Sequence, residues 1–466
     1  MSLARELSRR VAALRYEEMP AEAIYWGKVA VLDTVGVTLA GAVEAAPRIV
    51  EDVLALPGDG GSSLIFGTKR RASCLDAALV NGTAAHMLDF DNTCPSMGGH
   101  VSATMIPALL AAGEAFGVSG RNLLLAHAAG FEVGARLGRA LNVWHTDKGW
   151  HPTATLGIFA VAAACARLLE LSAEQTTTAF ALSASMAAGI KVNFGTMTKP
   201  LHAGQAARCG LQAVLLARKG FTANAEAFEH KQGFFNVFNG AGNFRAEDIL
   251  EGWAQPLEIV SPGACYKQFP CCGSTHTPIE AALRLVGEHG TFAVDEIERV
   301  DSFTHASRLV HTDRPLPQGE LEAKFSVQYC VARALLQGTV TLRDFEGDAY
   351  RDPVVRTLLP RVHAVPSNAE QFPPDNRFGA EVRVTLKDGR MMAAKIERAL
   401  GRTSANPIPV SGMKDKFASC ASRALTAEGV AAAARMIDTF DALERVRDFT
   451  DLLQTHVVTG HDILQS

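Results

Sequence analysis

Lys199 stands where helix electrostatics disfavour a cation. The stretch GTMTKPLHAG (195–204) places it before Pro200, which we expect to be the first residue of a helix. A helix N-terminus carries partial positive charge, so an ammonium beside it is mildly destabilising. A bound carboxylate would compensate, because it would accept from the exposed N–H groups and pair with the ammonium. We therefore expect Lys199, with His202 on the next turn, to bind an anionic ligand. The alternatives are that Lys199 extends into solvent and His202 packs as an ordinary side chain.

A second polar cluster lies in NGTAAHMLDFDNTCPSMGGHVSA (81–103), where a helix end and the following loop hold His86, Asp89, Asp91, Thr93 and His100. A proline and two glycines break the helix, so we expect His100 at the start of the next one. Carboxylates beside imidazoles suit proton transfer. Helix capping within a solvated loop is the alternative explanation.

Two more histidines precede predicted helices. His151 lies before Pro152 in KGWHPTATLG (148–157), where a helix N-terminus would disfavour its cationic form and leave a neutral general base. His276 follows Ser274-Thr275 in CYKQFPCCGSTHTPIEAAL (265–283), and Lys267 lies just upstream. Capping or core packing would also explain both histidines. If these helix starts converge, they form an anion-binding pocket equipped for proton transfer.

Composition excludes several classes of protein. The 466 residues are 48% hydrophobic with a formal net charge of −4, and no basic stripe indicates a nucleic-acid partner. The apolar run TLGIFAVAAACA (155–166) is too short to span a membrane and predicts a buried core helix. Nine cysteines without a C-x-x-C pair favour the cytoplasm and no metal site. Motifs for nucleophilic hydrolysis, phosphate binding and dinucleotide binding are absent from the sequence.

The pattern along the chain predicts a mainly α protein with a smaller α+β part. Apolar residues recur every three or four positions up to about residue 255. Strand patterns follow at 297–306, 361–367 and 380–399, the last with a polar turn typical of a hairpin. Helical patterns lie before these strands at 274–289 and between them at 322–338, and return after Pro409. The last segment could therefore rejoin the first, making the helical domain discontinuous.

These clusters, in this order, resemble the MmgE/PrpD family. The resemblance rests on NGTAAHMLDFDNT, GGHVSATMIPALLA, GWHPTATLG, NFGTMTKPLHAGQAARCG, FPCCGSTH and AKFSVQY. It implies a large all-helical domain (1–268 and 403–466) and an α+β lid domain (269–402). It also implies a homodimer without metal or organic cofactor. Helices that are apolar all round favour a dimer too, because a monomer would expose them.

The resemblance implies an active site of Asp89, Thr93, His100, His151, Lys199 and His276. His100 or His151 would transfer the proton, with Asp89 orienting an imidazole. The remaining role, binding a polycarboxylate substrate, would fall to Thr93, Lys199, His202, Lys267 and His276.

We therefore expect a cofactor-independent lyase, a decarboxylase or dehydratase, acting on a small di- or tricarboxylate such as cis-aconitate. Two alternatives stay open: an epimerase or racemase of a dicarboxylate such as iminodisuccinate, and a catalytically silent carboxylate-binding protein. The loop between Thr93 and His100 is longer than in the decarboxylases and closer to the epimerase form. Cys272 stands where some relatives have a second histidine.

Overall fold

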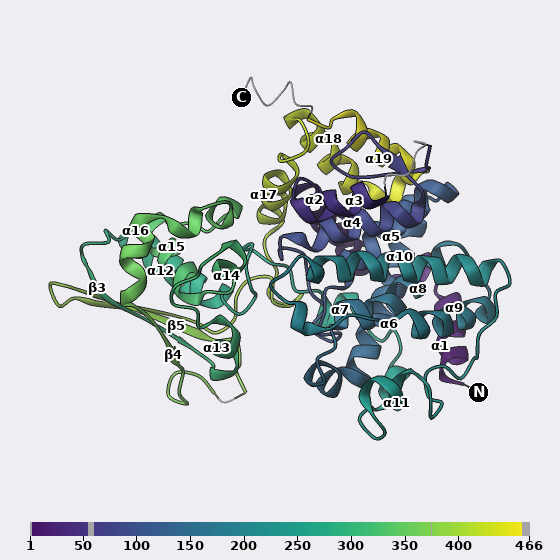
Figure 1. Cartoon of the computed structure of the whole chain (residues 1–466), viewed down its shortest axis with the longest axis horizontal. Coiled ribbons are helices and arrows are strands. Elements are labelled where there is room, and N and C mark those ends of the chain that lie inside the picture. The colour runs from purple at the N-terminus through teal and green to yellow at the C-terminus, as the bar shows by residue number, and fades with distance from the viewer. Residues whose placement is uncertain (1, 55–59, 374, 459–466) are drawn as a thin grey trace. The chain divides into compact units, whose positions relative to one another are not determined.

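The chain divides into two compact units (Figure 1). The first unit comprises Met1–Tyr266 and Thr403–Ser466, and the second comprises Lys267–Arg402. The computed structural model describes residues 2–54, 60–373 and 375–458. The sequence analysis placed the first boundary two residues later, and so assigned Lys267 to the helical part.

The first unit is helical, as the spacing of apolar residues predicted. Its longer helices are α1 (Leu3–Ala13), α2 (Ala21–Ala42), α3 (Ala45–Leu54), α4 (Cys74–Met87), α5 (Val101–Phe116), α6 (Gly120–Asp147), α8 (Gly157–Leu168), α9 (Ala173–Met186), α10 (Thr198–Arg218), α17 (Val410–Ala421), α18 (Ala427–Asp438) and α19 (Val446–Thr455). Shorter ones are α7 (Pro152–Thr155) and α11 (Phe234–Asn239). A two-residue antiparallel ladder, β1 (Ser63–Leu64) with β2 (Arg71–Ala72), was not predicted.

Two glycines bring α4 and α10 unusually close. A Cβ atom on Gly82 would lie 2.8 Å from the Cα of Gly204, and one on Gly204 would lie 2.3 Å from the main-chain oxygen of Leu79. Larger side chains would therefore force the two helices apart. Because Gly82 lies near the end of α4 and Gly204 near the start of α10, this contact places those two helix ends side by side.

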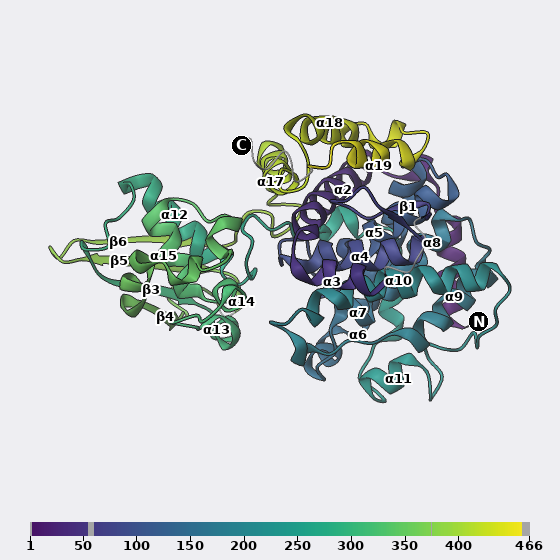
Figure 2. The same cartoon turned by 45° about the horizontal axis from the view of Figure 1, so that its top comes forward.

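The C-terminal segment of the first unit packs on its N-terminal helices. In Figures 1 and 2, α17 lies alongside α2, and the two helices are in extensive contact. Gly36 of α2 permits the approach, since a Cβ atom there would lie 3.1 Å from the Phe417 ring. The expected return of the chain to the helical part is thus observed.

Helix α2 is long and apolar enough to cross a membrane, a feature that the sequence analysis overlooked. However, 83% of its most apolar 18-residue window is buried, which identifies it as a core helix of the first unit. The predicted core helix at 155–166 is confirmed, since nearly every residue of α8 is buried. The helices that are apolar all round therefore bury that surface inside this unit. They give no physical reason for a dimer.

The second unit is an α+β domain with a four-stranded sheet in the order β4-β3-β5-β6. Its strands are β3 (Ile297–Thr304), β4 (Val362–Pro366), β5 (Ala380–Leu386) and β6 (Met391–Ile396), and its helices are α12 (His276–His289), α13 (Ala306–Thr312), α14 (Glu320–Lys324), α15 (Val327–Gln337) and α16 (Pro353–Leu358). Strands β3 and β4 are parallel, and the β5–β6 hairpin is antiparallel. All the predicted strands are confirmed, and so is the fold class.

Alternation along β5 shows how this core forms. Ala380, Val382, Val384 and Leu386 are buried, and the residues between them are half-buried. The buried face packs against α12, and α15 packs over β3 and β4 (Figure 2). One apolar face every second residue is the pattern expected for a sheet covered on one side by helices.

Candidate active site

The end of α4 reverses the chain and presents two aspartates. The helix ends at Met87, and Asp89 follows with a φ of 53°, in the left-handed region. That conformation usually falls to glycine after a helix, although aspartate tolerates it better than most residues. The turn allows the next residues to run back past the last turn of α4. Asp91 is thereby directed towards His86, five residues earlier in the chain.

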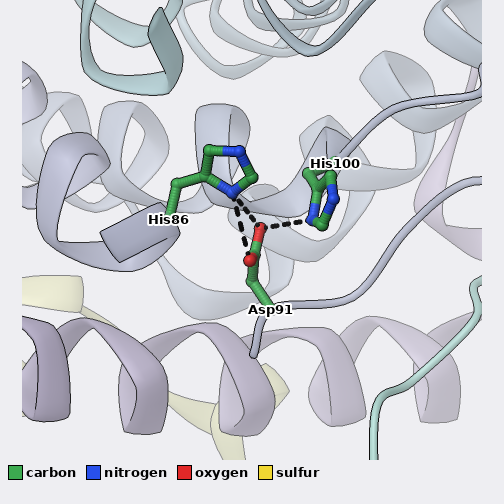
Figure 3. A group of neighbouring side chains, drawn as sticks. All are labelled: His86, Asp91 and His100. Atoms are coloured by element: carbon green, nitrogen blue, oxygen red, sulfur yellow. Dashed lines mark hydrogen bonds and ion pairs between the residues drawn. The ribbon is translucent and has the colours of Figure 1, made fainter. Parts of the chain in front are cut away.

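Asp91 holds two imidazoles at once (Figure 3). Its carboxylate oxygens lie 3.1 and 3.0 Å from His86 Nδ1, and Oδ2 lies 2.9 Å from His100 Nδ1. The His86 and His100 rings are 4.4 Å apart, edge to face. The side chains of Asp91 and His86 are fully buried, and that of His100 is 12% exposed. Asp91 therefore fixes the orientation of both rings, with each Nδ1 facing a carboxylate oxygen.

This arrangement corrects the expected role of Asp89. The sequence analysis assigned the orientation of an imidazole to Asp89, but His100 Nε2 is 3.9 Å from Asp89 Oδ1, whereas its Nδ1 is 2.9 Å from Asp91. Neither Asp91 nor His86 was given a role from the sequence, although both stood in the polar cluster. Their sequence spacing carries no signal because the contact depends on the left-handed turn at Asp89.

Asp89 instead pairs with Lys199. The Lys199 ammonium donates to Asp89 Oδ1 at 2.7 Å, and both side chains are about 10% exposed. The expectation that a bound ligand alone compensates Lys199 at rest is therefore wrong, because a carboxylate of the chain does so. Helix α10 begins at Thr198, so Pro200 is its third residue rather than its first. Lys199 is the second residue, and it remains at the helix N-terminus as predicted.

His151 and His202 form the other side of the cluster. Their Nδ1 atoms are 3.0 Å apart, so one ring donates a hydrogen bond and the other accepts it. His151 is the residue before α7, as predicted, and its main-chain N–H donates to the Gly189 carbonyl. The rings of His86 and His151 stack with centroids 5.8 Å apart. The four imidazoles therefore form one continuous group, from His100 through His86 and His151 to His202.

Burial keeps three of these imidazoles neutral at pH 7. It lowers the pKa of His86 to about 4, against the opposing effect of Asp91. Burial, and then the nearby His86 and Lys199, lower the pKa of His151 well below its usual range. Burial and Lys199 also lower the pKa of His202. The expectation of a neutral His151 agrees with this, but desolvation is the main cause.

The carboxylate of Asp91 responds in the opposite sense. Burial alone would raise its pKa, but the neighbouring His100 and His86 outweigh burial and hold the pKa well below its usual range. The site thus combines an ionised carboxylate, neutral imidazoles and the Lys199 ammonium. Such a group can bind a carboxylate and move a proton at the adjacent carbon.

Three predicted residues lie apart from the contacts described so far. Thr93 is half-buried in the first unit, and its main chain pairs with Cys265 in an isolated bridge. Lys267 and His276 belong to the second unit. His276 is the first residue of α12, and its Nε2 lies 3.3 Å from the Cys271 carbonyl oxygen. Thr275 precedes the helix without a side-chain capping hydrogen bond.

The triad of His86, Asp91 and His100 also has the composition of a metal site. One ligand atom from each lies within 4.8 Å of the others, close enough to surround a divalent ion. However, Asp91 lies 3.0 Å from His86 Nδ1 and 2.9 Å from His100 Nδ1, which are the distances of direct hydrogen bonds between a carboxylate and an imidazole. The sequence predicted no metal at these residues.

The chain matches known proteins along most of its length. Residues 5–247 match the MmgE/PrpD N-terminal domain, and residues 269–442 match the MmgE/PrpD C-terminal domain. It is 29% identical to a cis-aconitate decarboxylase of Homo sapiens, covering 97% of this chain and 95% of that protein. It is 26% identical to a cis-aconitate decarboxylase of Aspergillus terreus, covering 96% and 94%. A mitochondrial 2-methylcitrate dehydratase of Yarrowia lipolytica is 25% identical over 48% of this chain and 45% of its own length.

Proposed function

Because the chain belongs to the MmgE/PrpD family, we propose that it is a lyase that decarboxylates or dehydrates a small tricarboxylate such as cis-aconitate. The observation that carries the proposal is the placement of neutral His151, Asp91-held His100 and cationic Lys199 in one cluster. Similarity to decarboxylases over nearly the whole chain supports the substrate class. We propose further that the reaction needs no metal or organic cofactor.

Lys199 provides the electrostatic part of the mechanism. A substrate carboxylate would take the place of Asp89 on the ammonium. The N–H groups of Thr198 and Lys199, at the start of α10, already donate to Thr196. Loss of carbon dioxide leaves an electron pair on carbon, and removal of a proton next to a carboxylate does the same. A fixed cation stabilises that developing charge, and one such donor is typically worth about 3 to 4 kcal/mol.

The imidazoles provide the proton transfer. In a dehydration, neutral His151 would accept the proton from carbon, and a protonated imidazole would donate to the departing hydroxyl group. In a decarboxylation, no proton is removed from carbon, and an imidazole would deliver one to the carbanion. Asp91 would stabilise an imidazolium at His100 through their 2.9 Å contact. His100 is therefore the better proton donor, and His151 the better acceptor.

Two other functions stay open on specific grounds. An epimerase of a dicarboxylate would use the same cluster of side chains, because its reaction also begins with removal of a proton next to a carboxylate. The long loop between Thr93 and His100 favours this alternative. A silent carboxylate-binding protein would keep Lys199 but would not need the imidazole cluster. For this reason we rank it last.

Assembly and location are also proposals. We propose a homodimer on the family resemblance alone, because the apolar helices are buried within the first unit. We propose the cytoplasm on the cysteine usage. Lys267 and His276 remain candidates for substrate binding by the same resemblance.

Proton NMR of the purified protein in D₂O tests the reaction. Cis-aconitate, 2-methylcitrate and iminodisuccinate are added in turn without metal. Loss of carbon dioxide or water from one of them supports the lyase and names its branch. Deuterium entering a substrate whose skeleton survives supports the epimerase instead. If the compounds bind but none of the three is altered, the result contradicts the lyase and supports the binding protein.

A further inference from the structure

A buried ion pair joins the C-terminal segment to the chain beside the candidate site. Lys416 of α17 lies with its Nζ 2.6 Å from Oδ1 of Asp33, which belongs to α2. The Lys416 side chain is 6% exposed and that of Asp33 is fully buried. Burying two charges costs several kcal/mol per ion in desolvation, so such a pair is a poor source of stability compared with apolar packing. A specific positional role would account for it better.

Further hydrogen bonds of the two side chains show what the pair could position. The Lys416 ammonium donates to the carbonyl oxygen of Phe90 at 2.7 Å. Asp33 Oδ2 accepts from the main-chain N–H of Asn92 at 3.1 Å and from its side-chain amide at 3.0 Å. The pair therefore holds the main chain on both sides of Asp91. Its two halves come from helices that lie more than 300 residues apart in the sequence but side by side in the first unit (Figure 1).

We propose that Lys416 and Asp33 are positioning residues that fix the direction of the Asp91 carboxylate. This inference rests on the proposed function, because it concerns the reaction that the Asp91-held imidazoles perform. Holding the carbonyl before Asp91 and the N–H after it leaves the intervening main chain little freedom. The carboxylate is then kept at hydrogen-bond distance from both His86 and His100. A shift of about 1 Å at such a contact can lower turnover by up to about 100-fold.

A second lysine of α17, Lys414, provides the control for a substitution of Lys416. Lys414 lies two residues before Lys416 and pairs with Asp438 at 2.8 Å, with side chains 43% and 51% exposed. That pair lies on the surface, where an ion pair contributes little to stability. Lys414→Met therefore removes the same charge from the same helix without touching the Phe90 carbonyl.

The experiment compares Lys416→Met, the double variant Asp33→Asn/Lys416→Met and Lys414→Met. The double variant leaves no buried charge unpaired, so it stays informative if Lys416→Met does not fold. The first readout is the low-field proton NMR signals of the imidazole N–H groups bonded to Asp91, in substrate-free protein. These signals are assigned by their loss in His86→Gln and His100→Gln. The second readout is kcat and KM on whichever substrate is turned over.

We expect the double variant to shift or lose the Asp91-bonded signals and to lower kcat by about 10- to 100-fold, with KM little changed. Lys414→Met should match the wild type in both readouts. A folded double variant with wild-type signals and wild-type kcat would overturn the inference. If the wild type turns over no substrate, the proposed function fails, but the NMR comparison still decides whether the pair positions Asp91.

Discussion

The Lys199 ammonium lies 2.7 Å from a carboxylate oxygen of Asp89, across 110 residues of sequence. The cation that helix electrostatics disfavours is thus neutralised by the chain before any ligand binds. A substrate carboxylate would have to displace Asp89 to reach Lys199. Asp89 is also the residue of the left-handed turn that leads the chain to Asp91. Displacing it from Lys199 would therefore act on that turn.

Removing the Lys199 charge should abolish most of the activity. Lys199→Met is expected to lower kcat by at least about 100-fold, because one fixed donor to the developing charge is lost. The control is Lys191→Met, since Lys191 lies in the preceding short turn and its ammonium donates to the Thr146 carbonyl. Steady-state kinetics decide the matter, and an active Lys199→Met enzyme would remove Lys199 from the mechanism.

Two substitutions of Asp89 should differ in stability but not in activity. Asp89→Gly and Asp89→Ala both remove the carboxylate that pairs with Lys199, so both should change the activity alike. Because Asp89 has a φ of 53°, the glycine variant should be more stable than the alanine variant by about 1 kcal/mol. Chemical denaturation measures the difference. Equal stabilities would mean that the turn relaxes when the ion pair to Lys199 is lost.

Asp91→Asn should impair catalysis although its shape is retained. An aspartate accepts from both imidazoles, whereas an asparagine has one acceptor oxygen and one donor amide group. One of His86 and His100 must then change its tautomer or lose its hydrogen bond. We expect kcat to fall by about 100-fold or more, the usual contribution of a positioned acid or base. Wild-type kcat in this variant would show that Asp91 serves only the fold.

Buried neutral histidines should make the protein sensitive to acid. Burial lowers the pKa of His86, His127 and His145 each to about 4. Between pH 6.5 and 4 these side chains are protonated in the unfolded chain but not in the folded one. The free energy of unfolding therefore falls as the pH falls through this window, by about 1.4 kcal/mol per pH unit for each histidine.

His127 allows a clean measurement of this effect, because it lies outside the imidazole cluster and burial lowers its pKa. In His127→Gln, the slope of the unfolding free energy against pH should be smaller by the contribution of one histidine, about 1.4 kcal/mol per pH unit. Denaturation at pH 7, 6 and 5 gives both slopes. Identical slopes for His127→Gln and the wild type would contradict the prediction.

Metal removal should leave the activity intact. The triad of His86, Asp91 and His100 could surround a divalent ion, but the proposed mechanism uses it as a hydrogen-bonded group. Prolonged treatment with EDTA should therefore not change kcat, and added Zn²⁺ should not raise it. Loss of activity on chelation, restored by one divalent ion, would replace the hydrogen-bonded triad with a metal site.

Short stretches of sequence were enough to predict the local elements and the family. Alternation of apolar and polar residues placed the strands at 380–399, and apolar residues at helical spacing placed α8. These patterns lie within short stretches of chain, so they can be read without knowing the fold. The motifs around Asp89, His151 and Lys199 also sufficed to indicate the family, which the family matches confirmed.

The pairing of the side chains in the candidate site follows from how the helices pack. The contact between α4 and α10 at Gly82 and Gly204 brings Lys199 to Asp89, and the left-handed turn at Asp89 directs Asp91 to His86 and His100. The approach of α17 to α2 brings Lys416 to the same segment. Such contacts join residues far apart in the chain and depend on helix packing to within about an ångström. No spacing of residue types along a single sequence specifies them.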